Sequence, residues 1–445
     1  KMENAKTRYR MPPLSFFKLL AETWKVNNLK LIFTTNFIEF VDLYFFIHCA
    51  PIIEKIFVPP EWHGWMSSIA LWISYGIPPL AALAFGAVGD NKGRRFTMLF
   101  SSTLMCLLTV SLVILPSYDQ IGIWSLILFI SIRFFQAVSI AAEGACAWVF
   151  GYESTQSFSK TAFTVPFISM GEGLSGVFSL LGFLGLFAVL SFLGEEMIVR
   201  ILFAVLSVAF IWVLSKRKEL KDVKDYLDAR EQLTYFGYSR VTEVIKNHNK
   251  QLVCLAAIMM AYPLAFNISY IYMPELLKLH FAYSDHDVML HNILITASEM
   301  IISVSFGYLA YRLEIQEILN RKWLALAIAF VSFFASVVFY LWFSANTPTY
   351  FMITLTQILM LVGVLNLAFL IGNFYQTFAI IGRFSSAAFS WACARIIGLI
   401  IGIAPMQWLH SCGGYEYFLC FTALSLIQII GIYLSRVPVI EDWQR

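Results

Sequence analysis

Two carboxylates, Glu39 and Asp42, lie three residues apart inside a strongly apolar run of the chain. Residues at this spacing are neighbours on one face of an α-helix, and Asn36 extends the same polar stripe. Two acids this close disfavour each other's ionisation, and partial removal from water adds to the effect. One of them could therefore hold a proton near neutral pH, as a proton-coupled carrier requires. The alternative is that either acid is only ion-paired and holds helices together.

A second polar set, Arg133, Gln136 and Glu143, follows one side of another apolar run. Arg133 and Glu143 are separated by ten residues, about 15 Å on an ideal helix, so they cannot pair with each other. We therefore expect Arg133 to meet an acid of the first stripe, with Glu143 deeper towards the cytoplasm. Arg395, in a later apolar run, could receive a substrate carboxylate or bond the carbonyls of a helix end.

The composition indicates which elements position these groups. Apolar residues make up 59% of the 445 residues and charged residues only 13%, whereas a soluble domain carries roughly a quarter charged residues. Apolar runs of about 20 residues, long enough to cross a hydrocarbon core, recur along the chain. A charge at the centre of such a helix costs roughly 2.5–3.5 kcal/mol on insertion scales, so intramembrane charges mark a working region.

The runs predict an all-α membrane protein of twelve transmembrane helices in two six-helix bundles. A basic amino-terminal tail (1–30) precedes the first bundle (31–214), a charged linker (215–250) follows it, and the second bundle (251–436) ends in a short tail (437–445). The predicted spans are 31–57, 62–88, 96–115, 121–150, 162–192, 197–214, 251–279, 288–311, 323–343, 350–381, 384–410 and 415–434.

The distribution of basic residues predicts the orientation. The amino-terminal tail, the turn at 92–95 and the linker are rich in Lys and Arg, whereas the loops on the opposite side are poor in them. By the positive-inside rule both termini and the linker are cytoplasmic. We expect a multi-pass protein of the cell membrane, which is the inner membrane in a Gram-negative cell.

The turn between the second and third spans combines glycines, one acid and paired bases. Its polar and glycine positions are Gly86, Gly89, Asp90, Gly93, Arg94 and Arg95. Asp90 could cap the next helix or pair with a base of the neighbouring bundle, while Arg94 and Arg95 would face acidic lipid and helix ends. We interpret this loop as a cytoplasmic latch that biases inward against outward states. The pair Phe306-Gly307 echoes Phe85-Gly86 in the second half.

Four stretches resemble the major facilitator superfamily and, within it, the metabolite:proton symporter group related to the proline/betaine transporters. They are Gly86-x-x-Gly89-Asp90-x-x-Gly93-Arg94-Arg95, Asn36-Phe37-x-Glu39-Phe40-x-Asp42-x-Tyr44, Arg133-Phe134-Phe135-Gln136 followed by Glu143, and Gly402-x-Ala404-Pro405. Pro78 stands where this group carries an arginine, and Ala141 and Ala142 replace two glycines. The missing arginine disfavours a di- or tricarboxylate substrate and leaves a zwitterion ahead.

The resemblance implies a secondary active transporter that imports a small polar metabolite, such as a betaine, amino acid or organic acid, together with protons; Na+ is the alternative coupling ion. The two bundles would rock about a midplane site formed by the polar residues above. Two other interpretations stay open: export of a drug- or siderophore-like compound by proton antiport, and a solute sensor that moves nothing.

We expect no enzyme activity, cofactor, metal site or nucleic-acid partner. A phosphate-binding loop, a nucleophile elbow and metal-ligand spacing do not stand out in the sequence. The expected partners are the solute, the coupling ion and the lipid bilayer, with the chain acting as a monomer.

Overall fold

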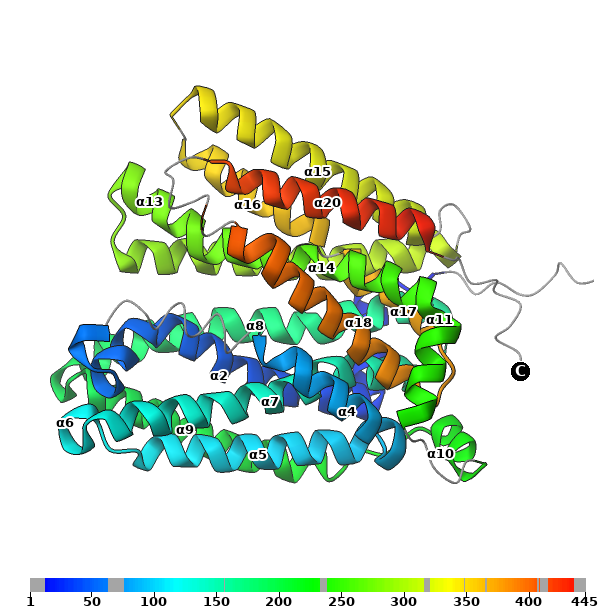
Figure 1. Cartoon of the computed structure of the whole chain (residues 1–445), viewed down its shortest axis with the longest axis horizontal. Coiled ribbons are helices and arrows are strands. Elements are labelled where there is room, and N and C mark those ends of the chain that lie inside the picture. Colours follow the sequence, from blue (N-terminus) through cyan, green and yellow to red (C-terminus); the bar gives the residue numbers. More distant parts are fainter. Residues whose placement is uncertain are drawn as a thin grey trace, which may run out of the picture.

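The computed structural model of the chain describes residues 13–62, 76–155, 157–232, 238–315, 321–347, 349–364, 366–405, 408 and 415–435. These described residues form helices and connecting turns, with no β-strand among them. Figure 1 shows the helices in two groups that run along the long axis, the amino-terminal half below and the carboxy-terminal half above. Residues 63–75 of the predicted second span, and the predicted tail 437–445, lie outside the described residues.

The described residues of the amino-terminal half form six long helices and several short ones. The long helices are α2 (Asn27–Phe57), α4 (Pro78–Lys92), α5 (Arg94–Ile114), α7 (Ile123–Glu153), α8 (Phe158–Leu190) and α9 (Glu195–Arg217). The short ones are α1 (Phe16–Lys25), η1 (Pro60–Trp62), α6 (Tyr118–Ile121) and η2 (Ser191–Leu193). Helix α9 continues to Arg217, which the sequence had assigned to the linker.

The carboxy-terminal half follows the linker helix α10 (Lys224–Glu231). Its α-helices are α11 (Tyr238–Met259), α12 (Ala261–Asn267), α13 (Met273–Phe281), α14 (Asp285–Ile315), α15 (Arg321–Ala345), α16 (Tyr350–Val364), α17 (Asn366–Thr377), α18 (Arg383–Ile397) and α20 (Tyr417–Leu434). Two π-helical segments interrupt this pattern: η3 (Ile268–Tyr272) joins α12 to α13, and η4 (Gly398–Ile403) continues α18.

Length and composition of these helices fit a membrane. Nine helices of the described residues are long and apolar enough to span a bilayer, and a shorter apolar helix, Phe418–Leu434, adds to them. Large apolar side chains such as Leu107, Trp124 and Ile211 are exposed on the outside of the bundle. Such a surface fits contact with lipid, because the hydrocarbon core accepts apolar side chains without cost.

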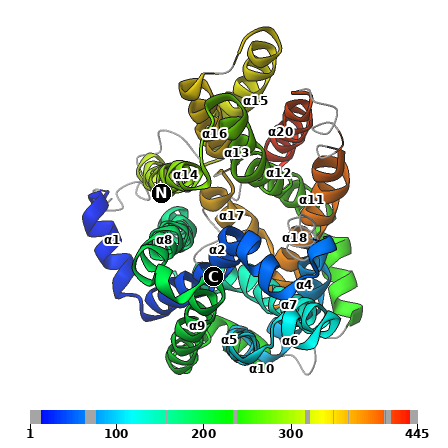
Figure 2. The ribbon, with the colours of Figure 1, turned by 90° about the vertical axis from the view of Figure 1, so that its left-hand side faces the viewer.

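The two halves make their most extensive contacts at two helix crossings, α8 against α14 and α4 against α18. Figure 2, a view along the helices, shows both pairs side by side. Each crossing has a glycine at a close approach. A Cβ on Gly86 of α4 would lie 2.9 Å from Cα of Ser385, and one on Gly307 of α14 would lie 2.6 Å from the Pro166 ring. The Phe-Gly echo in the sequence therefore falls at corresponding crossings of the two halves.

Candidate functional site

The two acids of the first stripe lie near the middle of α2, buried inside the amino-terminal half. Asn36, Glu39 and Asp42 are 1%, 5% and 1% exposed. Helix α2 packs against α7, α8 and α9, and α5 packs against α7 and α9. The carboxylates therefore project into protein, where an unpaired charge would be costly.

Asp42 and Arg133 form a buried ion pair. Arg133 Nη1 lies 3.3 Å from Asp42 Oδ2, and the guanidinium lies 4.0 Å from the centroid of the Phe46 ring. The spacing argument for Arg133 is thus matched, since its partner is an acid of α2 and not Glu143. One turn along, Gln136 Nε2 donates a hydrogen bond to Thr109 Oγ1 of α5 at 3.1 Å.

Glu39 and Glu143 share one partner, Arg217, at the end of α9. Arg217 Nη1 lies 3.0 Å from Glu39 Oε1 and donates to Glu143 Oε2 at 2.7 Å, and Nη2 pairs with Glu143 Oε1. Ser101 Oγ also donates to Glu143, at 2.8 Å. We call Glu39, Asp42, Arg133, Glu143 and Arg217 the charge cluster. It joins α2, α7 and α9.

Sequence reasoning missed Arg217 because it lies in a run of bases and acids, Ser215–Leu220, that looks like a solvated linker. Its side chain is fully buried, whereas its neighbour Lys216 is half-buried and Lys218 is exposed. A signal was present: Phe203, Phe210 and Arg217 follow each other at seven-residue spacing on the buried face of α9. Continuing that face by two turns would have placed Arg217 inside the bundle.

The sequence predicted a loop at Gly86–Arg95, but Gly86, Gly89 and Asp90 belong to the end of α4, and Asp90 bonds across to the other half. Its carboxylate accepts hydrogen bonds from the backbone N–H of Ser385 (2.9 Å), the Ser385 hydroxyl (2.6 Å) and the N–H of Phe384 (3.4 Å). These groups belong to the first turn of α18, where unpaired N–H groups favour an acid. Asp90 therefore caps a helix of the other half, not the helix that follows it. Gly89 permits the approach, because its Cβ would lie 2.0 Å from the Phe384 ring.

Arg94 completes this contact from inside. We expected it to face acidic lipid, but that expectation is wrong, since the side chain is fully buried. It pairs with Asp90 (3.1 Å) and Glu153 (2.9 Å) and donates to the carbonyl of Ile380 (2.9 Å). Glu153, which the sequence did not single out, also pairs with Arg383 of the other half at 3.2 Å. Together, Asp90, Arg94, Glu153, Arg383 and Ser385 form what we call the first latch.

The linker docks onto the junction of α4 and α5. Gly93 has a φ of +100°, a value that favours glycine. Two residues later, the backbone N–H of Arg95 donates a hydrogen bond to the Asp222 carboxylate at 3.0 Å. The exposed Arg95 side chain donates to the carbonyl of Lys218 at 3.0 Å. Tyr226 of α10 donates to the Asp90 carbonyl at 3.1 Å, and burial raises the pKa of this phenol. We call this end of the molecule, where α10 lies, the linker end.

A second contact between the halves lies beside the other crossing at the linker end. Arg321, 1% exposed, pairs with Glu314 at 2.8 Å and donates to Thr161 Oγ1 of α8 at 2.9 Å. We call these three residues the second latch. Its ion pair lies within the carboxy-terminal half, whereas the bond to Thr161 crosses to the amino-terminal half, as does a longer one (3.5 Å) from Arg321 to the carbonyl of Ser159.

Three further intramembrane charges lie elsewhere. Arg395 is on α18, with its guanidinium 4.1 Å from the Trp391 ring centroid, and so belongs to the other half from the charge cluster. Glu172 of α8 lies beside Asn36 and Trp148, within electrostatic range of Glu299 on α14. Tyr270 donates to Glu299 at 3.0 Å. Glu172 and Glu299 therefore face each other across the α8–α14 crossing.

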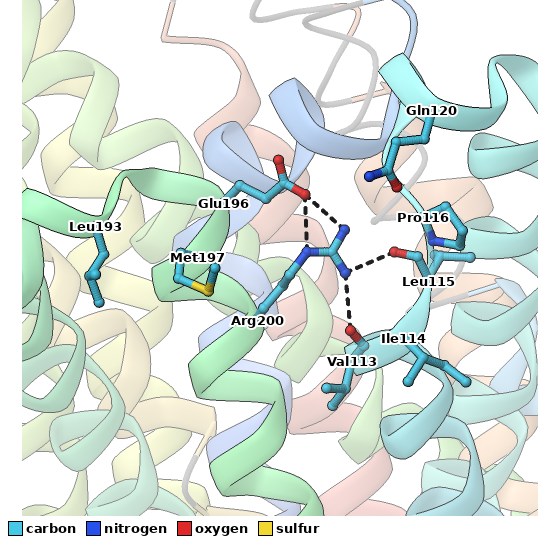
Figure 3. A pocket seen from close by; sticks show the side chains of 9 residues that line it. All are labelled: Val113, Ile114, Leu115, Pro116, Gln120, Leu193, Glu196, Met197 and Arg200. Atoms are coloured by element: carbon cyan, nitrogen blue, oxygen red, sulfur yellow. Dashed lines mark hydrogen bonds and ion pairs between the residues drawn. The ribbon is translucent and has the colours of Figure 1, made fainter.

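A pocket of about 510 Å3 opens at the end opposite α10. Figure 3 shows Arg200 of α9 among the residues that line it, with hydrogen bonds to the Glu196 carboxylate and to the carbonyls of Val113 and Leu115. These hydrogen bonds of the Arg200 guanidinium connect the turn after α5 to α9. This contact is separate from the charge cluster.

Solved structures identify the fold. FucP, a major facilitator superfamily transporter in the outward conformation, matches 92% of this chain and 99% of its own with a TM-score of 0.68 at 12% identity. The proton:xylose symporter XylE matches 92% of this chain and 95% of its own with a TM-score of 0.65 at 14% identity. The chain has the major facilitator fold. This fold consists of two six-helix bundles, as the sequence predicted.

Sequence relatives place the chain within this fold more narrowly. It is 27% identical to a citrate-proton symporter of Klebsiella pneumoniae over 269 residues, 59% of each chain. It is 24% identical to the glycine betaine/proline/ectoine/pipecolic acid transporter OusA of Dickeya dadantii, over 60% of this chain and 54% of that protein. A Staphylococcus aureus protein, provisionally named a proline/betaine transporter, is 29% identical over 31% of this chain and 29% of its own.

These matches span between about three tenths and three fifths of the relatives, and no family model matches the chain. In sequence the chain resembles metabolite:proton symporters, as the motif around Glu39 and Asp42 indicated. The proteins that it resembles in sequence and in fold are transporters, not enzymes.

Proposed function

We propose that this protein is a proton-coupled symporter that imports a small polar metabolite, such as a betaine, an amino acid or an organic acid, by alternating access. The observation that carries the proposal is the charge cluster: three carboxylates and two guanidinium groups buried together inside one bundle. Buried charges are expensive, and structural packing could be achieved with apolar side chains at lower cost. Buried ionisable groups are needed, however, in a site that binds and releases a proton.

The relatives support the coupling ion more firmly than the solute. The names of two similar proteins, one matched by sequence and one by fold, specify proton symport, with citrate for one and xylose for the other. The names of two others specify betaine and proline. A proton is thus the shared element, and the solute is proposed only as a small polar metabolite.

The latches suggest which state the structure represents. The first and second latches hold the two halves together at the linker end. If the linker end is cytoplasmic, as the basic residues predict, closure there corresponds to an outward-facing or occluded carrier. Rocking of the bundles would have to break both latches before the solute could leave.

Proteoliposomes with an imposed pH gradient test the proposal. Glycine betaine, proline and citrate are supplied in turn, and solute uptake is measured together with proton movement. We expect proton entry that depends on one of these solutes. Proton exit during loading would indicate antiport, and a protein that binds a solute but moves neither would be a sensor; either result contradicts symport.

The acids of α2 give the matched variants. Glu39→Gln and Asp42→Asn should each abolish uptake driven by the pH gradient, because each removes a carboxylate whose charge a guanidinium balances. Glu195→Gln is the control: this acid forms an exposed pair with Lys55 at the opposite end of the molecule, and uptake should stay at the wild-type rate. Uptake near the wild-type rate in both α2 variants would contradict a role for these acids in coupling.

A further inference from the structure

Arg217 is held rigidly between two acids from different helices. It is the last residue of α9, and its side chain has no exposed surface. Besides Glu39 and Glu143, it binds α5, donating to the Met98 carbonyl at 3.0 Å and to Ser102 Oγ at 2.5 Å. The guanidinium is therefore fixed by groups from α2, α5 and α7.

The charges of the cluster do not balance when every acid is ionised. Asp42 has its own base, Arg133, at 3.3 Å. Arg217 alone faces both Glu39 and Glu143. Because a guanidinium stays protonated in proteins, the cluster would carry one net negative charge. An uncompensated buried charge costs several kcal/mol, and a single added proton removes it.

In the part of the chain that the structure describes, Arg217 is the base that pairs with Glu39 and with Glu143. The charged groups that act on Glu39 are Arg217 and Asp42. Around Glu143, α5 contributes the hydroxyls of Ser101 and Ser102. From α8, the nearest acid of the neighbouring helix is Glu172, which lies beside Asn36, one turn from Glu39. Because Asp42 and Glu172 are acids, neither of them offsets the second carboxylate.

We propose that Glu39 and Glu143 share a single proton across Arg217, and that Arg217 is the positioning residue that makes this pair a proton-binding site. This deepens the proposed symport and rests on it for its role in transport. At any moment one of the two acids is a neutral carboxyl group, and the other is a carboxylate that pairs with the guanidinium of Arg217. Release of the proton leaves two carboxylates on one base, so that the acids of α2 and α7 repel each other. Proton loss and movement of these helices are thereby coupled.

Infrared spectroscopy of the full chain in lipid nanodiscs tests this without any solute. The readout is the C=O stretching band of protonated carboxyl groups at neutral pH, normalised to the amide band. Glu39→Gln and Glu143→Gln should each remove the intensity of one carboxyl, since the acid that remains is then balanced by Arg217. The double variant should remove no more than either single variant, which is the signature of a shared proton.

Arg217 supplies the second arm. Arg217→Gln removes the base, so both acids should be protonated and the band should gain the intensity of one carboxyl. Arg217→Lys keeps the charge and should leave the band at wild-type intensity if its thermal unfolding shows a folded protein. Arg200→Gln, on the same helix but outside the cluster, is the control and should change nothing.

Three results would overturn the proposal: loss of intensity in only one of the two single variants, additive loss in the double variant, or no loss at all. The first assigns the proton to one acid, the second assigns two protons, and the third assigns none. The infrared result needs no transport, so it separates the shared proton from the proposed function. If the double variant loses no more band intensity than a single variant but the protein moves no protons in proteoliposomes, the proposed symport is wrong and the shared proton site is supported.

Discussion

The two crossings between the halves are built alike but locked differently. Each places a glycine of one half against a helix of the other, Gly86 at α18 and Gly307 at α8. In the first latch, ionised groups from both halves meet, with Glu153 of α7 on Arg383 of α18. In the second latch the ion pair stays within one half, and neutral groups of α8, the Thr161 hydroxyl and the Ser159 carbonyl, accept the bonds that cross.

This difference indicates a division of labour. Breaking an ion pair that is buried across an interface leaves charges without partners, so the first latch resists opening strongly. Exchanging a hydroxyl for water costs far less, so the second latch can open with little penalty. We therefore expect the α4–α18 crossing to control the rate of opening at the linker end, with the α8–α14 crossing following.

The largest effect is expected for Asp90→Asn. The change removes the charge that caps α18 and leaves Arg94 with Glu153 alone, at a cost of about 3–5 kcal/mol for a broken buried pair. Hydrogen exchange at the first amides of α18 should rise by about two orders of magnitude or more. Asp119→Asn, at the opposite end and exposed, is the control. An unchanged exchange rate at the Ser385 amide would contradict the role of Asp90 in the first latch.

A smaller effect is expected for Thr161→Val in the second latch. The variant keeps the shape of the side chain and the Glu314–Arg321 pair. It removes the hydroxyl that accepts the hydrogen bond from Arg321 across the two halves. A single hydrogen bond of this kind contributes about 1–2 kcal/mol. Exchange at the first turns of α8 should rise by about tenfold, measured in the same experiment. A rise equal to that of Asp90→Asn would abolish the proposed division of labour.

The smallest effect concerns α1, which flanks the second crossing. Lys160 of α8 pairs with Glu22 at 2.8 Å, and its hydrogen bond lowers the pKa of Glu22 below the ordinary 4.5. A lowered folded-state pKa stabilises docking of α1 above pH 4.5, and this contribution is lost as the pH falls through the lowered value.

Because Glu22 is exposed, Lys160→Met should change α1 docking only slightly at neutral pH. It should flatten the pH dependence below 4.5. Fluorescence of Trp24, whose ring packs against Phe33 and Phe167, reports the docking. A pH profile identical to the wild type would show that this pair does not hold α1.

Much of the architecture could be predicted from the sequence, because hydrophobic length fixes a transmembrane span with few alternatives. The partner of Arg133 was also predictable, since helical rise excluded Glu143 and left the acids of α2. Burial of the bases was not predictable. Arg94, Arg217 and Arg321 lie where basic residues usually mark a membrane surface, yet all three side chains are buried.

The reason lies in what a one-dimensional pattern contains. The positive-inside rule counts charges near span ends and does not ask which way each side chain points. Whether Arg217 meets water or Glu143 depends on α5 and α7, which are distant in the sequence and close in space. The same holds for Glu153, whose role is visible only once Arg383 of the other half lies beside it. Tertiary contact decided these assignments.

The short connection from α9 to α10 has a mechanical consequence. Arg217, at its start, lies in the charge cluster, while Asp222 and Tyr226 further along hold the junction of α4 and α5, where Asp90 lies. A displacement of the end of α9 would therefore be transmitted to the end of α4 along the backbone of this connection, and not only through packed side chains. If the proposed proton release displaces the end of α9, the number of residues in this connection limits how far the end of α4 that carries Asp90 can move.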